Sequence, residues 1–275
     1  MAVLFAFTAI AQTQVIFDDF NDGNDDGWEQ FSPLDMVGAS SVFSFPDVGD
    51  GNKGYRLFSQ APPVPDAGPG RSFTYRTPVY SDFYAAVDVL DWVNDVDQAF
   101  GLLLRVDNIG LGQTTGYVLN YDPQQASGNR AQIHFKSVTG EAAVDTIGAA
   151  DITLETGHDY RIVAEVAGNT FTGKVYDHLD LSQPVVIYSG VDETYSEGMA
   201  GLFNYYRGGE ATDSDIGIAD STFDNYYTSA ETPAAIANEA YYGFSGEPYV
   251  VALLSLIHIS EPTRLLSISY AGFSL

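Results

Sequence analysis

Four apolar segments follow one another in the middle of the chain: SDFYAAVDVLDWV (residues 81–93), QAFGLLLRVDN (98–108), TGYVLNYDP (115–123) and NRAQIHFKSV (129–138). Each has the length of a β-strand, is rich in Val, Ile, Leu, Phe or Tyr, and is separated from the next by Asn, Asp, Gly, Pro or Ser. None carries a sustained apolar period of 3.6, so helices are not indicated. The four segments predict an antiparallel meander.

The last of these segments shows how the strands are expected to face. Apolar residues occupy the odd-numbered positions 131, 133 and 135, whereas the even-numbered positions are Gln132, His134 and Lys136. Val87 and Val89 alternate with their neighbours in the same sense. Because successive side chains of a strand point to opposite faces, one face is expected in the core and the other is left polar and aromatic for a ligand.

The segments on either side of the meander continue this pattern. Gly168-Asn169 joins two alternating runs and predicts a tight hairpin. About a dozen short strands at even spacing, without a sustained helix, predict an all-β protein, an antiparallel two-sheet β-sandwich of the jelly-roll type. The further expected strands span residues 15–19, 40–45, 55–59, 71–76, 143–147, 159–167, 170–177, 185–188, 198–206 and 216–227.

Composition limits the possible partners. The 275 residues are 45% hydrophobic, which is enough for one large core or two modest ones. The 11 basic residues against 37 acidic ones give a net charge of −26, which argues against nucleic acid or an anionic membrane surface as a partner. The chain has no cysteine, so no disulfide is possible.

The first 14 residues resemble a secretory signal peptide or its remnant. Ala2–Ala11 is a ten-residue apolar run that ends in an A-x-A arrangement, although the usual basic residues before it are missing. The run is too short to span a bilayer, so no membrane insertion is expected. The alternative is a buried first strand. The signal interpretation predicts a secreted or cell-surface protein.

The other end of the chain is expected to lie outside the fold. Residues 230–253 lose the alternation and gain Ala, Glu and Pro, which predicts a linker to a further module of the same polypeptide. LSLIHISEPTR (254–264) and ISYAGFSL (268–275) resemble the translation of a sequencing-library adapter, separated by the space of a short index. Residues 254–275 are then an artefact without function; an apolar anchor or sorting signal is the alternative.

The order of several longer motifs resembles a known superfamily. These motifs are IFDDFNDGNDDGW (16–28), YRLFS (55–59), FGLLLRVDN (100–108), LETGHDYRIVAEVAGNTFTGKVYD (154–177) and EGMAGLFNYYRGGEATDSDIGIADSTFDNYYTS (197–229). Together they are similar to the concanavalin A-like lectin/glucanase superfamily, in its laminin-G-like branch of bacterial extracellular proteins, over residues 15–229. The resemblance implies two curved sheets with the first and last strands adjacent in one of them. It does not define a function, because this fold hosts lectins, carbohydrate-binding modules, glycosidases, lyases and adhesion domains.

An acidic cluster follows the first strand. Asp and Asn residues crowd positions 18–26, and Ca²⁺ prefers six to eight oxygen ligands of this kind. The resemblance implies a structural calcium that ties the N-terminal strand to the last one, with Asp19, Asp224 and a backbone carbonyl of residues 49–54 as counterparts. A solvated acidic turn is the alternative. The predicted metal ligands are Asp18, Asp19, Asn21 and Asp224.

The polar face of the sheet is the candidate site for a saccharide. Sugars are held by aromatic rings that stack on their apolar CH faces and by planar donors and acceptors that bind hydroxyls. A single sequence does not settle which strand positions face the groove, and an aromatic residue such as Trp92 can equally fill the core. The candidates are Tyr84, Trp92, Arg105, Asn120, Gln132, His134, Lys136, Asn204, Tyr205 and Arg207.

Catalytic machinery is poorly supported by the sequence. Glycoside hydrolases need two carboxyls across the scissile bond, and family 16, which has this fold, takes them from one strand as Glu-x-Asp-x-x-Glu. That motif does not occur here, and Asp88 and Asp91, three residues apart, would lie on opposite faces of a strand. Zinc-binding, nucleotide-binding and serine-hydrolase motifs are also missing from the sequence.

The sequence therefore predicts a secreted, calcium-stabilised β-sandwich that binds a poly- or oligosaccharide without cleaving it. One alternative is a divergent glycoside hydrolase or lyase, which two facing carboxylates in the groove would favour. The other is an adhesion or spacer domain, which a filled groove or one blocked by residues 61–70 would favour.

Overall fold

Two antiparallel β-sheets packed face to face make up the described part of the chain, as the all-β prediction required. The structure is a computed structural model that describes residues 15–61, 68–92, 98–125, 130–206 and 218–230. Within these ranges the helical structure is one short 3₁₀ turn, η1 (Asp35–Val37). No described helix has the length and apolar character that crossing a membrane requires.

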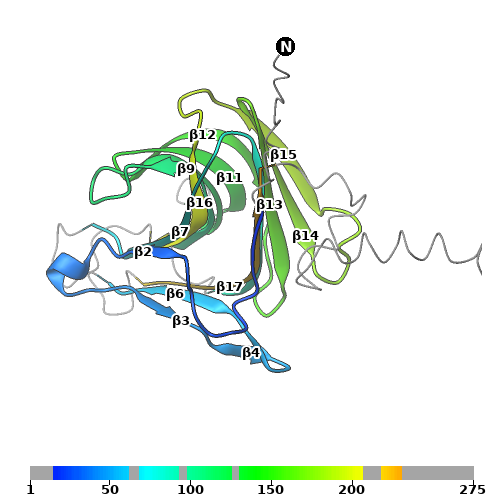
Figure 1. The fold of residues 1–275 in the computed structure, drawn as a ribbon. Helices are drawn as coiled ribbons and strands as arrows, with labels where there is room; N and C mark the ends of the chain where they lie inside the picture. Colours follow the sequence, from blue (N-terminus) through cyan, green and yellow to red (C-terminus); the bar gives the residue numbers. More distant parts are fainter. Residues whose placement is uncertain (1–14, 62–67, 93–97, 126–129, 207–217, 231–275) are drawn as a thin grey trace, which may run out of the picture.

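The first sheet has seven strands and is strongly curved. It curls so that its hollow side faces away from the other sheet (Figure 1). Its strands, in spatial order, are β12 (Ala142–Asp151), β11 (Arg130–Thr139), β10 (Thr115–Gln125), β9 (Gln98–Asp107), β16 (Gly198–Tyr206), β7 (Arg71–Tyr80) and β2 (Glu29–Phe31).

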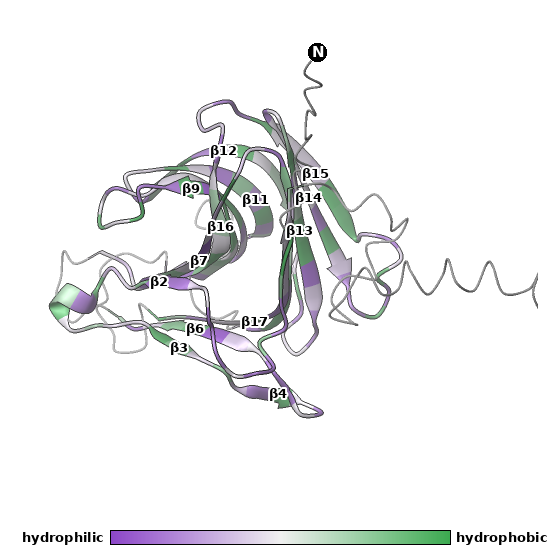
Figure 2. Ribbon diagram, in the orientation of Figure 1, coloured by the Kyte–Doolittle hydropathy of each residue, from purple (hydrophilic) through white to green (hydrophobic). Residues whose placement is uncertain are grey.

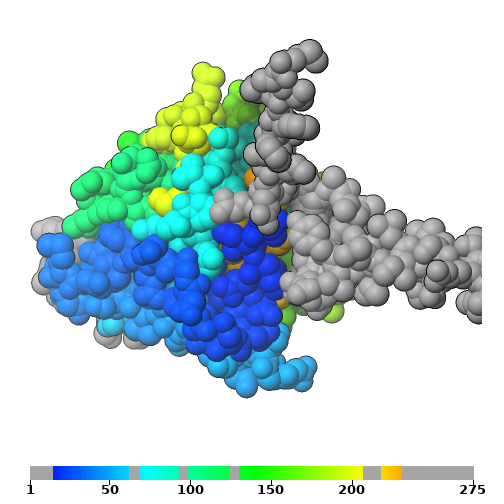
Figure 3. Space-filling model, in the orientation of Figure 1, coloured from blue at the N-terminus to red at the C-terminus, as the bar shows by residue number. Residues whose placement is uncertain are grey.

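The second sheet has eight strands and packs against the convex side of the first. Its strands, in spatial order, are β15 (Val186–Val191), β14 (Thr170–Asp177), β13 (Tyr160–Ala167), β8 (Phe83–Trp92), β17 (Ala219–Ser229), β6 (Tyr55–Ser59) and β3 (Val42–Ser44), and β1 (Val15–Asp18) pairs with β17. A separate two-stranded ribbon, β4 (Asp47–Gly49) and β5 (Asn52–Lys53), lies beside it. In the space-filling view the N-terminal segments, in blue, form the lower part of the visible face (Figure 3).

The predicted four-stranded meander is only partly present. β9, β10, β11 and β12 are consecutive neighbours, but β8, the first predicted strand of the meander, belongs to the opposite sheet, between β13 and β17. The chain thus changes sheets between Trp92 and Gln98. Periodicity alone could not reveal this crossing, because both sheets present the same alternation to the shared core.

The core lies between the sheets and is built by the predicted alternation. Ile133 and Phe135 of β11 point into it with Leu102 and Leu104 of β9, and Phe223 of β17 faces them from the second sheet. Bands of hydrophobic and hydrophilic residues alternate along the strands (Figure 2). Each fully buried aliphatic or aromatic side chain contributes about 1.5–3 kcal/mol to folding.

Two predictions, one from local turn residues and one from the superfamily resemblance, are confirmed in the register of the strands. Ala167 pairs with Thr170, so Gly168 and Asn169 form a two-residue hairpin loop in which Gly168 has φ +57°. Val15 pairs with Ser229, which places the first and last strands side by side in the second sheet. The fold therefore closes on itself and leaves the hollow side of the seven-stranded sheet uncovered by the other sheet.

Candidate functional site

The hollow side of the seven-stranded sheet carries the residues that alternate with the core positions. Lys136 pairs across the strands with Val118, and Val118 pairs with Leu103. Two residues further along, His134 pairs with Asn120, and Asn120 pairs with Gly101. Residues opposite one another share a face, so these two rows line the same concave surface.

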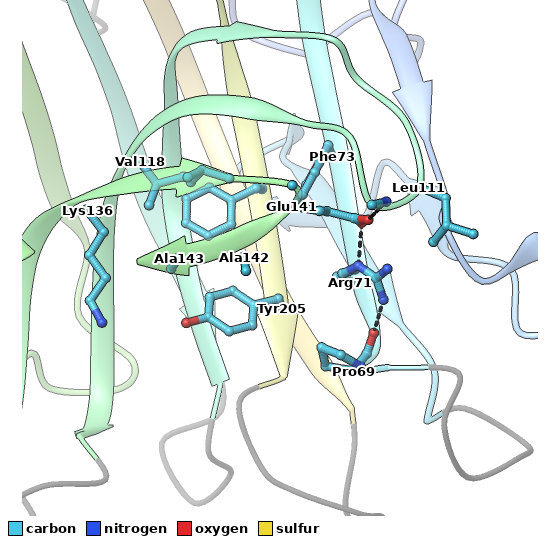
Figure 4. Close-up of a pocket in the computed structure, with 14 residues that line it drawn as sticks. Pro69, Arg71, Phe73, Leu111, Val118, Lys136, Glu141, Ala142, Ala143 and Tyr205 are labelled. Carbon is cyan, nitrogen blue, oxygen red and sulfur yellow. Dashed lines mark hydrogen bonds and ion pairs between the residues drawn. The ribbon is translucent and has the colours of Figure 1, made fainter. Parts of the chain in front are cut away.

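A cavity of about 590 Å³ opens on this surface. Its aromatic wall comes from β7 and β16: the rings of Phe203 and Tyr205 stack with centroids 6.2 Å apart, and Phe73 meets Phe203 edge-on at 6.4 Å. Lys136 lines the opposite side, and Figure 4 shows the Tyr205 hydroxyl pointing toward the side where Lys136 extends. The concave face is thus partly filled by apolar side chains but remains hollow.

An ion pair ties the loops together at the rim of the cavity. Arg71, at the start of β7, donates through Nε to Oε1 of Glu141 at 2.5 Å, and the two side chains are only 10% and 5% exposed. The second oxygen of Glu141 accepts the backbone N–H of Gly112 at 2.7 Å, while Arg71 also donates to the carbonyl of Pro69 at 2.8 Å (Figure 4). The β9–β10 and β11–β12 loops are therefore fastened to β7 across the concave face.

Beside the cavity lies a buried polar pair with unused hydrogen-bonding capacity. Asn120 and His134 are buried, and neither the amide atoms of Asn120 nor the ring nitrogens of His134 bond to a described residue. Their outer neighbours in the sheet are the small residues Gly101 and Ala149. Buried polar groups are nearly always hydrogen-bonded, so this pair is the kind of feature that a bound ligand satisfies.

Burial also governs the charges on this face. It lowers the pKa of His134 to about 3, with a smaller contribution from the Lys136 ammonium, so that the imidazole is neutral at pH 7. The same cause lowers the pKa of half-buried Lys136 below its ordinary value. The face therefore presents a neutral histidine next to an ammonium group.

The predicted saccharide residues divide into two groups in the structure. Asn120, Gln132, His134, Lys136 and Tyr205 share the concave face, the first four through the register of β10 and β11. Arg207 lies outside the described residues.

The other four candidates are placed elsewhere. Tyr84 packs on the outer face of the second sheet with Tyr227, and Trp92 is in the core against Phe100. The buried guanidinium of Arg105 donates to the carbonyls of Ser81, Tyr195 and Gly168 at one end of the sandwich. Asn204 points inward and bonds to Ser59, Ser72 and the carbonyl of Leu57.

Sequence reasoning missed Arg71, Phe73, Glu141 and Phe203. Phe203 directly precedes Asn204 and lies two positions before Tyr205, and only the alternation of faces along β16 shows that it shares the face of Tyr205 and not that of Asn204. The Arg71–Glu141 pair joins residues 70 positions apart, for which local spacing carries no signal.

The predicted calcium ligands are only partly available. Both carboxylate oxygens of Asp18 accept hydrogen bonds, from the Phe20 amide at 3.0 Å and the Trp28 indole at 2.8 Å. The side-chain oxygen of Asn21 accepts the amide of Lys53, whose ammonium reaches the same acidic turn at Gly23. No group of three acidic or histidine side chains poised for a metal occurs in the described ranges.

Asp224 and Asp19 remain as candidates for a cation. Burial, followed by the nearby carboxylates of Asp88 and Asp19, raises the pKa of Asp224 to about 7. Asp19 makes one bond, to the amide of Asn21 at 3.2 Å. The oxygens of Asp18 and Asn21 are thus used in the turn. One oxygen of Asp224 accepts the backbone N–H of Asn225 at 2.7 Å, so of the four predicted ligands Asp19 and the second oxygen of Asp224 are left.

Comparison with solved structures identifies the architecture. A galactose complex of the lectin UEA-II superposes with a TM-score of 0.52 at 9% identity, over 79% of this chain and 99% of that one. The exoplasmic/lumenal domain of VIP36 in its Ca²⁺- and Man2-bound form gives 0.51 at 12% identity, over 80% and 90%. A CBM2 module of the Dit protein of Lactobacillus casei BL23 phage J-1 gives 0.50 at 14% identity, over 79% and 97%.

The fold is that of jelly-roll lectins and carbohydrate-binding modules. No protein-family model matches the sequence, and no curated protein matches it. At these identities the likeness concerns the fold alone, so a function has to be argued from the concave face itself.

Proposed function

We propose that the chain binds a saccharide on the concave face of its seven-stranded sheet and does not cleave it. The observation that carries the proposal is the cavity whose aromatic wall, Phe203 and Tyr205, lies on the same face as the unsatisfied pair Asn120 and His134. Stacked rings fit the CH faces of a sugar, and an amide with an imidazole supplies donors and acceptors for its hydroxyls.

The state of the carboxylates favours binding over hydrolysis. Glu141 is the acidic residue among the described residues that line the cavity, and both its oxygens are engaged, by Arg71 and by Gly112. A glycosidase needs two carboxyls free to act as acid and as base or nucleophile. A divergent hydrolase or lyase remains the alternative; release of reducing sugar from the bound glycan would support it.

The experiment for this proposal is a glycan array on the full chain, followed by titration of Tyr205→Ala against the best glycan. We expect Tyr205→Ala to weaken binding about tenfold or more, since loss of a stacking ring removes a central contact worth on the order of 1.4 kcal/mol. Tyr75→Ala is the matched control, because Tyr75 belongs to the same concave face but does not line the cavity. Equal loss in both variants, or in neither, would contradict the proposed site.

We further propose that a calcium ion stabilises the junction of the first and last strands through Asp19 and Asp224. The buried carboxyl of Asp224 beside Asp19 supports this, because a cation would offset both burial and repulsion. Added Ca²⁺ should raise the melting temperature of the wild-type protein, which calorimetry measures. Asp224→Asn should no longer be stabilised by Ca²⁺, whereas the variant of an exposed control residue, Asp47→Asn, should still be stabilised. If Ca²⁺ does not change the melting temperature of the wild-type protein, the proposed calcium site is wrong.

The proposed setting is outside the cell. The apolar run Ala2–Ala11, which lies outside the described residues, and the net charge of −26 both support a secreted or cell-surface protein. A saccharide-binding sandwich would there act as an accessory unit that holds its polypeptide on a glycan.

A further inference from the structure

Lys136 is a cation of the cavity that lacks a counterion among the described residues. Its side chain is half-buried on β11, and it forms no hydrogen bond or ion pair with any of them. The ammonium nitrogen is not one of the buried unsatisfied polar atoms, so it keeps contact with solvent and an anionic group of a ligand can reach it.

Most other cations of the described chain differ from Lys136 in this respect. Arg76 donates to the carbonyl of Asp26, and Lys53, which likewise has no ion pair with a described residue, lies beside the acidic turn at Gly23 and does not line the cavity. The protein has 11 basic residues for 37 acidic ones, and carboxylates are therefore plentiful. The described pairs of lysines and arginines are Arg56 with Asp220, Arg71 with Glu141, Arg105 with Asp82, Arg130 with Asp151, Arg161 with Asp88 and Lys174 with Glu165.

The balance of charge inside the cavity follows from these pairs. Arg71 and Glu141 neutralise each other at the rim, which leaves Lys136 as the uncompensated charge among the described lining residues. The acidic surface opposes an anion only weakly there, because exposed charges beyond about 8 Å are largely screened at physiological ionic strength. The cavity is thus a local cationic site in an acidic protein.

Building on the proposed function, we infer that the preferred ligand is an acidic saccharide whose anionic substituent, a carboxylate or a sulfate ester, pairs with the ammonium of Lys136. The sugar ring would lie against Tyr205 and Phe203, on the aromatic side of the cavity, and the charge would face β11. Lysine meets either substituent as a point charge, so its geometry does not select between them.

The test compares charged saccharides with neutral counterparts of the same sugar. The full chain is titrated calorimetrically with oligogalacturonate and its methyl ester, and with a chondroitin sulfate oligosaccharide and its desulfated, methyl-esterified form. We expect at least one charged member to bind about tenfold more tightly than its neutral counterpart, because a charge-assisted hydrogen bond is lost in the latter. Preference for the uronate or for the sulfated sugar then identifies the substituent.

Variants assign this preference to one side chain. Lys136→Gln should remove the difference between charged and neutral forms, whereas Lys136→Arg should retain most of it. Lys174→Gln, which removes a lysine paired with Glu165 on the other sheet, is the matched control and should change nothing. Higher salt should weaken binding of the charged form only.

Three results would overturn the inference while leaving the proposed function intact. The neutral counterparts could bind as tightly as the charged forms, or the charge preference could survive in Lys136→Gln. The third result is that neutral glycans bind on the array while both charged probes fail. An array on which no glycan binds would instead remove the proposed function itself.

Discussion

Replacing Asp88 by alanine should lower the free energy of unfolding by about 3–5 kcal/mol, because it leaves the guanidinium of Arg161 buried without its counterion. The two side chains are 0% and 1% exposed. Asp88 accepts from Nε and Nη2 of Arg161 at 2.6 and 2.8 Å and from the side-chain amide (Nδ2) of Asn225 at 2.9 Å. Strands β8, β13 and β17 meet at this one carboxylate.

Burial and the neighbouring side chains have opposite effects on the pKa of Asp88. Burial alone would raise the pKa of Asp88, but the Arg161 guanidinium and the neighbouring His178 outweigh it and hold the pKa below its usual value. The carboxylate therefore stays charged at neutral pH, and alanine removes a full charge from the interior. Urea unfolding of the two proteins measures the loss.

The matched control for Asp88 is Asp151, which pairs with Arg130 on the surface at 2.5 Å. These side chains are 50% and 64% exposed, so Asp151→Ala should change the stability by less than about 1 kcal/mol. If both variants unfold at the same urea concentration, the buried pair does not hold the second sheet together as described.

The second large effect concerns pH and His134. Its pKa in the folded protein is lowered to about 3, first by burial and then by Lys136, whereas an unfolded histidine titrates near 6.5. The unfolded chain therefore binds the proton first as the pH falls. Stability is fully present above about pH 6.5 and declines below it, by about 2 kcal/mol at pH 5 for this group alone.

The measurement is urea unfolding of the unliganded protein between pH 7 and pH 4. His134→Gln should show a shallower loss of stability over this interval than the wild type, since its side chain does not titrate. Val118→Ala alters an apolar side chain of the same face, which makes no hydrogen bond to a carboxylate, and should keep the slope of the wild type. Identical slopes for wild type and His134→Gln would mean that the imidazole is not shielded from water.

Local patterning predicted much of the fold. The alternation of residues 131–136 correctly gave the core positions Ile133 and Phe135, and Gly168-Asn169 gave the hairpin. The adjacency of first and last strands came from the resemblance to a superfamily and is confirmed by the pairing of Val15 with Ser229. These features depend on neighbours in sequence or on the order of motifs.

The features that the sequence did not predict depend on contacts between distant segments. Period-two patterning does not tell which sheet a strand joins, and so β8 was expected in the meander. It also does not tell which alternate residues of a strand face the core when both faces are similar in polarity. In β16, Asn204 points inward and Tyr205 points toward the concave face. From the sequence, Arg105 was expected to bind a ligand, but its guanidinium donates hydrogen bonds to three backbone carbonyls instead.

Hydrogen–deuterium exchange with and without the glycan selected by the array tests most directly that the concave face is the binding surface. Our account predicts slower exchange in β10, β11 and β16, which carry Asn120, His134, Lys136 and Tyr205, and unchanged exchange in β13 and β14 of the opposite sheet. Protection confined to β13 and β14, or no glycan bound at all, would contradict it.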